Sequence, residues 1–314
     1  MDALSDILAA VRLSSGAFLD AELSAPWCIA AQVGPEDCRP IGHVPAHLVA
    51  YHYVVAGRMW IQTGDAPPLE VGAGEIVLLP RNDPHVLGSA PGLRPAVIDH
   101  LIRPPAGPGP ATLRHGAGGA ITQIVCGFLG CEAPNNPLVA TLPVLLRLTL
   151  GEGVGDEWIA SSFRHAAQEF ATGGIGSATV LGKLAELLFV EAVRRYVATL
   201  PEDRTGWLAG LRDRAVGRAL ALMHTRVAEH WTTAALAREC GLSRSAFAER
   251  FTTLIGLPPM RYLTQWRLQL AAVRLRDHTR PMAQIAYELG YESDAAFNRA
   301  FKRQFGITPA AWRR

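Results

Sequence analysis

The side chains best placed for recognition chemistry lie in two stretches near the C-terminus. Phe247 and Phe251, and again Phe297 and Phe301, recur at helical spacing, so each pair is expected to face a core. The opposite side of the first helix then presents Ser245, Glu249 and Thr252, with Ala248 on its flank. The opposite side of the second helix presents Ala295, Arg299 and Lys302, with Asn298 on its flank. Hydroxyl, carboxylate, amide and guanidinium groups in such rows can hydrogen-bond base edges and phosphates.

Histidine and cysteine side chains form a second chemical group, within the first 131 residues. His52 and His85 are candidate metal ligands, because imidazoles suit Zn, Cu, Fe or Ni. Cys28, Cys126 and Cys131 carry thiols in the same part of the chain, and a thiol that senses oxidants must be exposed, have a low pKa and have a resolving partner. Cys126 and Cys131 approach each other if the chain bends between them, and Cys28 meets one of them across strands. The alternative, that each thiol is buried and inert, remains open.

The two polar stretches belong to a unit that occurs twice. The first copy contains Leu236, Ala237, Gly241, Ser243, Phe247, Phe251, Gly256 and Pro259, and the second contains Ile285, Ala286, Gly290, Ser293, Phe297, Phe301, Gly306 and Pro309. Such self-similarity indicates a duplicated supersecondary unit. Each copy predicts a short helix closed by Gly and a second helix capped by Ser. This is a helix-turn-helix, whose second helix enters the DNA major groove.

The segments beside the two copies are expected to hold them in place. Residues 258–276 have a continuous helical pattern, and 19 residues of helix span roughly 28 Å. That length approaches the ~34 Å of one DNA turn, so both recognition helices can enter successive major grooves on one face of a duplex. Residues 207–230 are predicted to form one supporting helix before the first copy.

The last hundred residues resemble the AraC family of bacterial transcription regulators, in the strings LARECGLSRSAFAERF, IGLPPMRYLTQWRLQLAAVRL and IAYELGYESDAAFNRAFKRQFGITPAAWRR. The resemblance implies that double-stranded promoter DNA and RNA polymerase are partners. It carries base-reading roles to Ser245, Ala248 and Glu249 in the first recognition helix and to Asp294, Ala295, Asn298 and Arg299 in the second.

The chemistry of these side chains is compatible with those roles. Arg299 suits guanine O6 and N7, Asn298 suits adenine, and Glu249 can accept from cytosine N4. Ala248 and Ala295 offer only apolar contact. The remaining candidates suit phosphate contacts and are Arg250, Lys302 and Arg303.

The N-terminal half has the pattern of β-structure. From about residue 27 to residue 125, short β-branched or aromatic runs at 48–55, 58–62, 76–79 and 97–102 are separated by Gly and Pro clusters. Many short strands with turns at this spacing predict a sandwich or a small barrel.

This half resembles a cupin barrel, and more closely the cupin-type sensor of one AraC subgroup, in HYVVAG (52–57) and GAGEIVLLPRNDPH (72–85). His85 stands at the last histidine position of metal-binding cupins, but Ala50 stands where their Glu is expected. Because His52 shares strand parity with position 50, it should meet His85 in the barrel mouth, with His43, His47 or His100 as a third ligand. A metal ion and a ligand pocket lined by these residues both remain open. The subgroup includes regulators that respond to oxidants through cysteine, and this resemblance makes Cys28, Cys126 and Cys131 candidates for redox sensing.

Helical periodicity follows the β half. It predicts one helix that begins with residues 138–146, a second over residues 158–172 and a third over residues 177–200. In the family, similar helices serve dimerisation, and we therefore consider a homodimer. Packing of these helices against their own barrel is the alternative, and the sequence does not separate the two.

Charge and composition limit the partners and the compartment. Residues 206–314 hold 17 Lys and Arg against 8 Asp and Glu, a net charge of +9, whereas residues 1–205 carry a net charge of −7. The basic part is the electrostatic footprint of a polyanion partner. The start of the chain lacks a basic segment before an apolar one, and no apolar run is long enough to span a membrane. With an odd number of cysteines, five, the sequence predicts a cytoplasmic location and no membrane partner.

Together these observations predict an α+β, multi-domain protein. A cupin-like sensor domain is expected over residues 1–130, a helical linker and dimerisation region over 131–205, and an all-α DNA-binding domain with two helix-turn-helix units over 206–314. The expected function is that of a sequence-specific regulator that senses a small molecule or oxidant. The alternative is a cupin metalloenzyme, an oxygenase or isomerase, fused to a DNA-binding domain, which needs a third metal ligand and an open coordination site.

Overall fold

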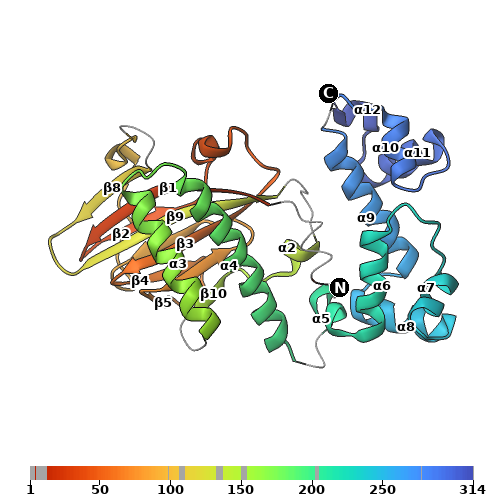
Figure 1. The fold of residues 1–314 in the computed structure, drawn as a ribbon, viewed down its shortest axis with the longest axis horizontal. Coiled ribbons are helices and arrows are strands. Elements are labelled where there is room, and N and C mark those ends of the chain that lie inside the picture. Colours follow the sequence, from red (N-terminus) through yellow and green to blue (C-terminus); the bar gives the residue numbers. More distant parts are fainter. Residues whose placement is uncertain are drawn as a thin grey trace. The chain divides into compact units, whose positions relative to one another are not determined.

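A computed structural model describes residues 4, 13–97, 99–105, 110–131, 137–149, 154–201, 205–276 and 278–313. The chain divides into two compact units (Figure 1). The β-rich unit contains residues 13–131 and 142–196, and the helical unit contains residues 197–314 together with 1–12 and 132–141. The two long helices after the barrel therefore belong to the same unit as the strands.

The β-rich unit is built from two sheets. The first has six strands in the order β10-β6-β3-β9-β1-β8, and the second has four strands in the order β2-β7-β4-β5. The strands are β1 (Leu13–Ser24), β2 (Cys28–Ala31), β3 (His47–Ala56), β4 (Arg58–Thr63), β5 (Leu69–Gly72), β6 (Glu75–Leu79), β7 (His85–Gly88), β8 (Ala111–Gly116), β9 (Ile121–Cys131) and β10 (Leu146–Thr149). Two short 3-10 helices, Pro35–Ile41 and Asp99–Leu101, interrupt the connections.

Alternation along the strands divides the apolar residues between two cores. Ala50, Val54 and Phe128 of the six-stranded sheet face Met59 and Leu87 of the four-stranded sheet, in one cluster between the sheets. The intervening residues point to the other face of the six-stranded sheet. Helices α3 (Val154–Ala171) and α4 (Ser177–Thr199) cover that face (Figure 1). The rings of Tyr53 and Phe163 are 4.4 Å apart there, so β3 is buried on both sides.

Two sequence expectations in this unit are wrong. The described residues of the predicted strand at 97–102 do not form it: Ala96 makes one isolated bridge to Ile29, Val97 is 75% exposed, and a 3-10 helix lies at Asp99–Leu101. A β-branched residue does not form a strand without a partner strand. Residues 138–146 do not form one helix either. A short helix, α2 (Pro137–Thr141), is followed by β10, where Leu146 and Leu148 alternate inward and pair with β6.

The helical unit contains the two predicted helix-turn-helix units. The helices are α5 (Trp207–Arg212), α6 (Arg214–Thr225), α7 (Thr233–Glu239), α8 (Arg244–Ile255), α9 (Pro259–Arg274), α10 (Met282–Glu288), α11 (Asp294–Phe305) and α12 (Pro309–Arg313). The Ser243 and Ser293 hydroxyls accept backbone N–H bonds at the starts of α8 and α11, as the sequence predicts. Phe247 and Phe251, like Phe297 and Phe301, are fully buried.

The supporting segment before the first copy is two helices and not one. Asp213 has an extended backbone, with ψ near 125°, and separates α5 from α6. Its carboxylate accepts from the backbone N–H groups of Ala215 and Val216 at 3.0 and 2.9 Å, which caps α6. An Asp in this position stabilises the start of a new helix. The apolar periodicity of residues 207–230 continues across this break, so periodicity alone predicts one helix where there are two.

Among the residues that the structure describes, no helix is both long and apolar enough to cross a membrane.

Candidate DNA-contact surface and ligand cavity

The two second helices, α8 and α11, present the side chains that the sequence singles out. Their Phe stripes are buried, so the opposite faces are left to solvent. Most of the candidates are exposed, namely Ser245, Glu249, Arg250, Asp294, Ala295, Arg299, Lys302 and Arg303, and two on the flanks, Ala248 and Asn298, are half-buried. The structure thus places the predicted contact residues on the exposed faces or the flanks of α8 and α11.

Some of these side chains already have partners within the chain. The Asn298 Nδ2 donates to the Asp294 backbone carbonyl at 2.8 Å, which leaves its Oδ1 as the free end. Reading adenine with both ends of the amide would therefore use the Oδ1 and the second hydrogen of the Nδ2. The Ser245 hydroxyl lies 3.3 Å from the hydroxyl of the capping residue Ser243. In each case the side chain is held near the start of its helix, where base contacts are made.

Arg250 differs from the other candidate cations because an acid holds it. Its Nη2 and Nε lie 2.5 and 2.8 Å from Asp213 Oδ2. Although burial of the Asp213 carboxylate opposes ionisation, the bonds from Arg250, Val216 and Ala215 outweigh that effect and lower its pKa. Arg250 thus joins α8 to the start of α6. The phosphate contact of Arg250 stays a prediction, and its guanidinium already binds the Asp213 carboxylate.

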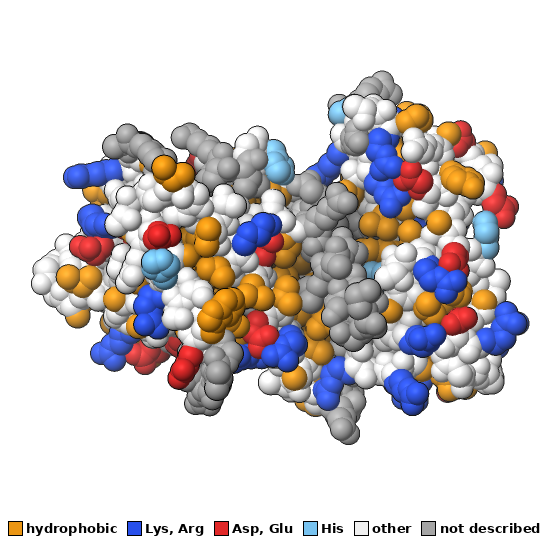
Figure 2. Space-filling view, viewed as in Figure 1, with side chains coloured by type: hydrophobic (Ala, Val, Ile, Leu, Met, Phe, Trp, Pro, Cys, Tyr) orange, Lys and Arg blue, Asp and Glu red, His pale blue; other side chains and the backbone are white. Residues whose placement is uncertain are grey.

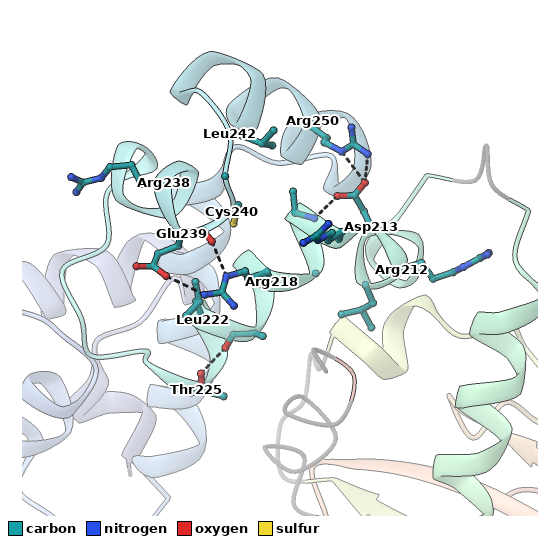
Figure 3. A pocket seen from close by; sticks show the side chains of 16 residues that line it. Arg212, Asp213, Arg218, Leu222, Thr225, Arg238, Glu239, Cys240, Leu242 and Arg250 are labelled. Atoms are coloured by element: carbon teal, nitrogen blue, oxygen red, sulfur yellow. Dashed lines mark hydrogen bonds and ion pairs between the residues drawn. The ribbon is translucent and has the colours of Figure 1, made fainter. Parts of the chain in front are cut away.

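This ion pair lies at the edge of an open cleft of about 1000 Å³ beside the first helix-turn-helix unit (Figure 3). The cleft is walled by the end of α5, by α6 along its whole length, and by the turn between α7 and α8. A second pair crosses it, since Arg218 donates to the Glu239 backbone carbonyl at 2.7 Å and lies 3.3 Å from its carboxylate. Both pairs brace α7 and α8 against α6 and thereby set the position of the first recognition helix.

The second unit is held by Arg267, a residue that the sequence analysis does not single out. Its Nε and Nη2 donate to the carbonyls of Val227 and Glu229 at 2.9 and 2.6 Å, and its Nη1 lies 3.5 Å from the Gly290 carbonyl. Gly290 has φ near 78°, and a Cβ there would lie 2.5 Å from the Ala228 oxygen. Arg267 thus ties the segment after α6 to the turn before α11, through contacts that no local pattern encodes.

The β-rich unit contains a cavity of about 520 Å³ between its two sheets. Most of its walls are apolar: Phe18, Leu19, Ile29, Ala30, Ala31, Val33, Leu87, Ile102, Pro104, Pro105, Pro110 and Ala111. The polar lining consists of Gln32, Glu36, Asp37, His52 and His85, with the thiol of Cys126. No Lys or Arg belongs to this lining in the described part of the chain. A volume of this size suits a small organic molecule.

The two predicted histidines meet in this cavity, one from each sheet. The Nε2 atoms of His52 and His85 are 2.7 Å apart. The other nitrogen of His85, Nδ1, lies 2.9 Å from the Asp83 carbonyl, and the Nδ1 of His52 lies 3.1 Å from the Sγ of Cys126. Burial lowers the pKa of both histidines, so the pair is neutral at pH 7.

These donors do not fit a metal ion in this arrangement. Cys126 and His85 lie against opposite nitrogens of the His52 ring, so the three donor atoms do not converge on one point. Of the expected third ligands, His47 is bonded through Nε2 to the Pro80 carbonyl at 2.6 Å. Within the described ranges, no group of three His, Cys, Asp or Glu residues is arranged to hold a metal ion. The expected metal site at His52 and His85 is therefore not formed, and the geometry gives no support to the metalloenzyme alternative.

The three cysteines proposed as redox sensors are buried. Burial raises the pKa of Cys28 and of Cys126, which opposes the thiolate that oxidants attack. Strand β9 runs unbroken from Ile121 to Cys131, so the bend that would bring Cys126 to Cys131 is missing. Five residues of strand place their Cα atoms roughly 17 Å apart on opposite faces of the sheet. None of the described cysteines is in a disulfide.

Comparisons with known proteins cover both units. Residues 2–198 match a family model described as Cupin, and residues 236–314 match one described as Helix-turn-helix domain. A putative AraC-like transcription regulator of Streptomyces lividans is 31% identical, over 89% of this chain and 97% of that protein. Another of Streptomyces antibioticus is 28% identical, over 100% and 99%. The HTH-type transcriptional regulator AlkR of Acinetobacter baylyi is 28% identical, also over 100% and 99%.

Proposed function

The chain belongs to the AraC-like family of transcription regulators, with a cupin domain before its helix-turn-helix domain, and we propose that it controls a promoter in response to a small molecule. Helices α8 and α11 bind the promoter DNA, and the β-rich cavity binds the effector. The observation that carries the DNA-binding half is that both second helices present exposed polar faces on a module with a net charge of +9. The relatives' names support a regulator rather than an enzyme.

The first test contrasts two exposed cations on α11. Replacing Arg299 with Ala is expected to weaken binding by about 1–3 kcal/mol, mainly at one base position, because a guanidinium contacts guanine with two bonds. Replacing Lys302 with Ala should weaken all duplexes alike and reduce the slope of log affinity against log salt by about one. Fluorescence anisotropy measures both effects, with full-length protein and a duplex selected by that protein from a random pool.

The same titration includes its control. Replacing Tyr287 with Ala, at a position 79% exposed on α10 and not among the predicted contact residues, should leave the affinity unchanged. Equal losses for Arg299→Ala on every base variant would remove Arg299 from base recognition. Salt-independent binding of the unmodified protein would contradict the proposal as a whole.

The effector is proposed to be a small molecule rather than an oxidant. The cavity between the sheets has a volume suited to such a ligand, whereas burial raises the pKa of Cys28 and of Cys126, and Cys131 is buried. Oxidant sensing by any of these three cysteines remains the rival input. It predicts that mass spectrometry finds a new disulfide or sulfenic acid after peroxide treatment of the folded protein.

A homodimer is proposed through the outer face of α4. The inner face of this helix packs on its own sheet, but Val180 and Leu187, seven residues apart, are 50% and 39% exposed. Figure 2 shows hydrophobic side chains over α3 and α4. Replacing Leu187 with Glu should raise the dimer dissociation constant at least tenfold in sedimentation velocity, because a charge would be buried. The matched control is Ile175→Glu, in the exposed turn between the helices; an unchanged constant for Leu187→Glu would place the interface elsewhere.

The proposal includes RNA polymerase as the partner through which bound protein changes transcription, and the cytoplasm as the location. Both follow from the regulator role. Transcription in vitro from the selected duplex, with purified polymerase and with and without the protein, tests the first. Cell fractionation tests the second.

A further inference from the structure

The pairing of β3 with β9 places a thiol beside a base at the wall of the cavity. Cys126 stands opposite His52 in the register of these strands, and its Sγ lies 3.1 Å from the His52 Nδ1. Both residues are at least 95% buried with respect to solvent, yet both line the cavity between the sheets. Both residues are therefore part of the cavity wall, although little of either side chain is exposed.

The hydrogen bonds fix which atoms carry protons. The Asp83 carbonyl can only accept, so the Nδ1 of His85 carries a hydrogen and its Nε2 is an acceptor. The facing Nε2 of His52 must then donate, which leaves the Nδ1 of His52 as an acceptor. The thiol of Cys126 is the donor that remains for it. A single chain of hydrogen bonds thus runs from the thiol through both imidazoles to the backbone.

The resting chain is neutral. Burial lowers the pKa of His52, and the neighbouring His85 lowers it further, whereas burial raises the pKa of Cys126, as do Asp20 and Asp37. The thiol therefore stays protonated until a reaction partner is bound. Because both shifts oppose a separated pair of charges, the proton passes to the His52 Nδ1 only as the sulfur bonds to that partner, and His85 continues to accept from the opposite side of the resulting imidazolium.

We propose that Cys126 adds covalently to small, neutral electrophiles whose carbon–carbon double bond is conjugated to a carbonyl group, with His52 as the base and His85 as the residue that positions it. This inference rests on the proposed sensor role of the cavity and names its ligand class. The apolar walls suit the carbon skeleton, and the carboxylates of Glu36 and Asp37 in the lining, without a described Lys or Arg, disfavour an anionic ligand.

The reaction needs no further reagent. The Sγ of Cys126 forms a bond to the β-carbon. The π electrons of the carbon–carbon double bond form a new double bond between the α-carbon and the carbonyl carbon, and those of the carbonyl bond move to its oxygen, giving an enolate. The thiol proton passes to the His52 Nδ1 and is then delivered to the α-carbon of the adduct. One C–S and one C–H bond replace the S–H bond and the π bond, nothing leaves, and His52 returns to its neutral form.

The test uses full-length protein, the enone 2-cyclohexen-1-one and anaerobic buffer. Mass spectrometry with peptide mapping follows the modification of each cysteine with time. Cys126 should gain one reagent mass at least tenfold faster than Cys28, a buried thiol outside the cavity lining. Cys126→Ala should abolish this fast adduct, His52→Gln should slow it at least tenfold, and Cys28→Ala should leave its rate unchanged.

A pH profile of the unmodified protein keeps the test decisive if the His52 variant does not fold. Transfer of the proton within the buried pair predicts a rate that is level between pH 6 and 9, whereas reaction of a free thiolate rises about tenfold per pH unit below its pKa. A rising profile, or modification of Cys126 only in urea, overturns the inference.

DNA affinity is measured on the same samples. If no adduct forms but DNA binding is normal, the inference falls and the regulator role stands. An adduct that leaves DNA affinity unchanged supports the site and contradicts the sensor role of the cavity.

Discussion

Replacing Phe301 with Ala is expected to destabilise the second helix-turn-helix unit by about 3–5 kcal/mol. Phe301 is fully buried, and its ring centroid lies 4.6 Å from that of Phe305 and 5.7 Å from those of Phe297 and Trp312. The substitution removes the whole ring and leaves a cavity between α11 and its neighbours. Such a loss exceeds what most single substitutions cause.

Hydrogen–deuterium exchange of the full chain measures this effect locally. Peptides covering α10 and α11 should lose several kcal/mol of opening free energy, while peptides from α7 and α8 change less. DNA binding should fall with the population of the folded second unit. Tyr287→Ala is the matched control, because this aromatic residue on α10 is 79% exposed and its loss should cost under about 0.5 kcal/mol. Equal losses for both variants would contradict the assignment of Phe301 to the core.

The sequence predicts the helical unit well because its determinants are local. The Phe spacings, the capping residues Ser243 and Ser293, and the glycines Gly241 and Gly290 that close the first helices all act within a few residues, and all are found as predicted. The duplication strengthens the inference, since each copy supports the other. By contrast, the single predicted helix over residues 207–230 is wrong because Asp213 takes an extended backbone and joins Arg250 of another helix.

The β-rich unit shows the limit of local patterns. Strand β1 begins at Leu13, ahead of the predicted β region, because its partners are β8 and β9, more than ninety residues away. Strand parity correctly places His52 on the inner face, yet only the register of β3 with β9 brings Cys126 beside it. The cavity and its hydrogen-bonded chain depend on such distant pairing, which one sequence does not reveal.

A buried histidine in the helical unit should make the stability of that unit depend strongly on pH. The Nε2 of His224 lies 2.7 Å from the Tyr262 hydroxyl, which also accepts from the Trp207 Nε1 at 2.7 Å. The Trp266 ring stacks on the imidazole at 4.1 Å, and within the described residues the Nδ1 of His224 has no hydrogen-bond partner. Burial lowers the pKa of His224 to about 3, against 6.5 for an unperturbed histidine. In the folded unit His224 is therefore neutral at pH 7.

Acidification is accordingly expected to destabilise the first helix-turn-helix unit. Because the folded pKa lies below the unfolded one, the contribution of His224 is fully present above pH 6.5 and is lost as the pH falls toward 3. One pKa unit corresponds to about 1.4 kcal/mol, so roughly 2 kcal/mol should be lost between pH 7 and pH 5.

Hydrogen–deuterium exchange of α6 and α9 in the full chain, corrected for intrinsic rates, measures this loss separately from the β-rich unit, where His52 and His85 act in the same direction. His224→Phe keeps the stacked ring but cannot be protonated, so this variant should be less stable at pH 7 and nearly insensitive to pH over this range. The same pH dependence in the variant would show that other groups cause it.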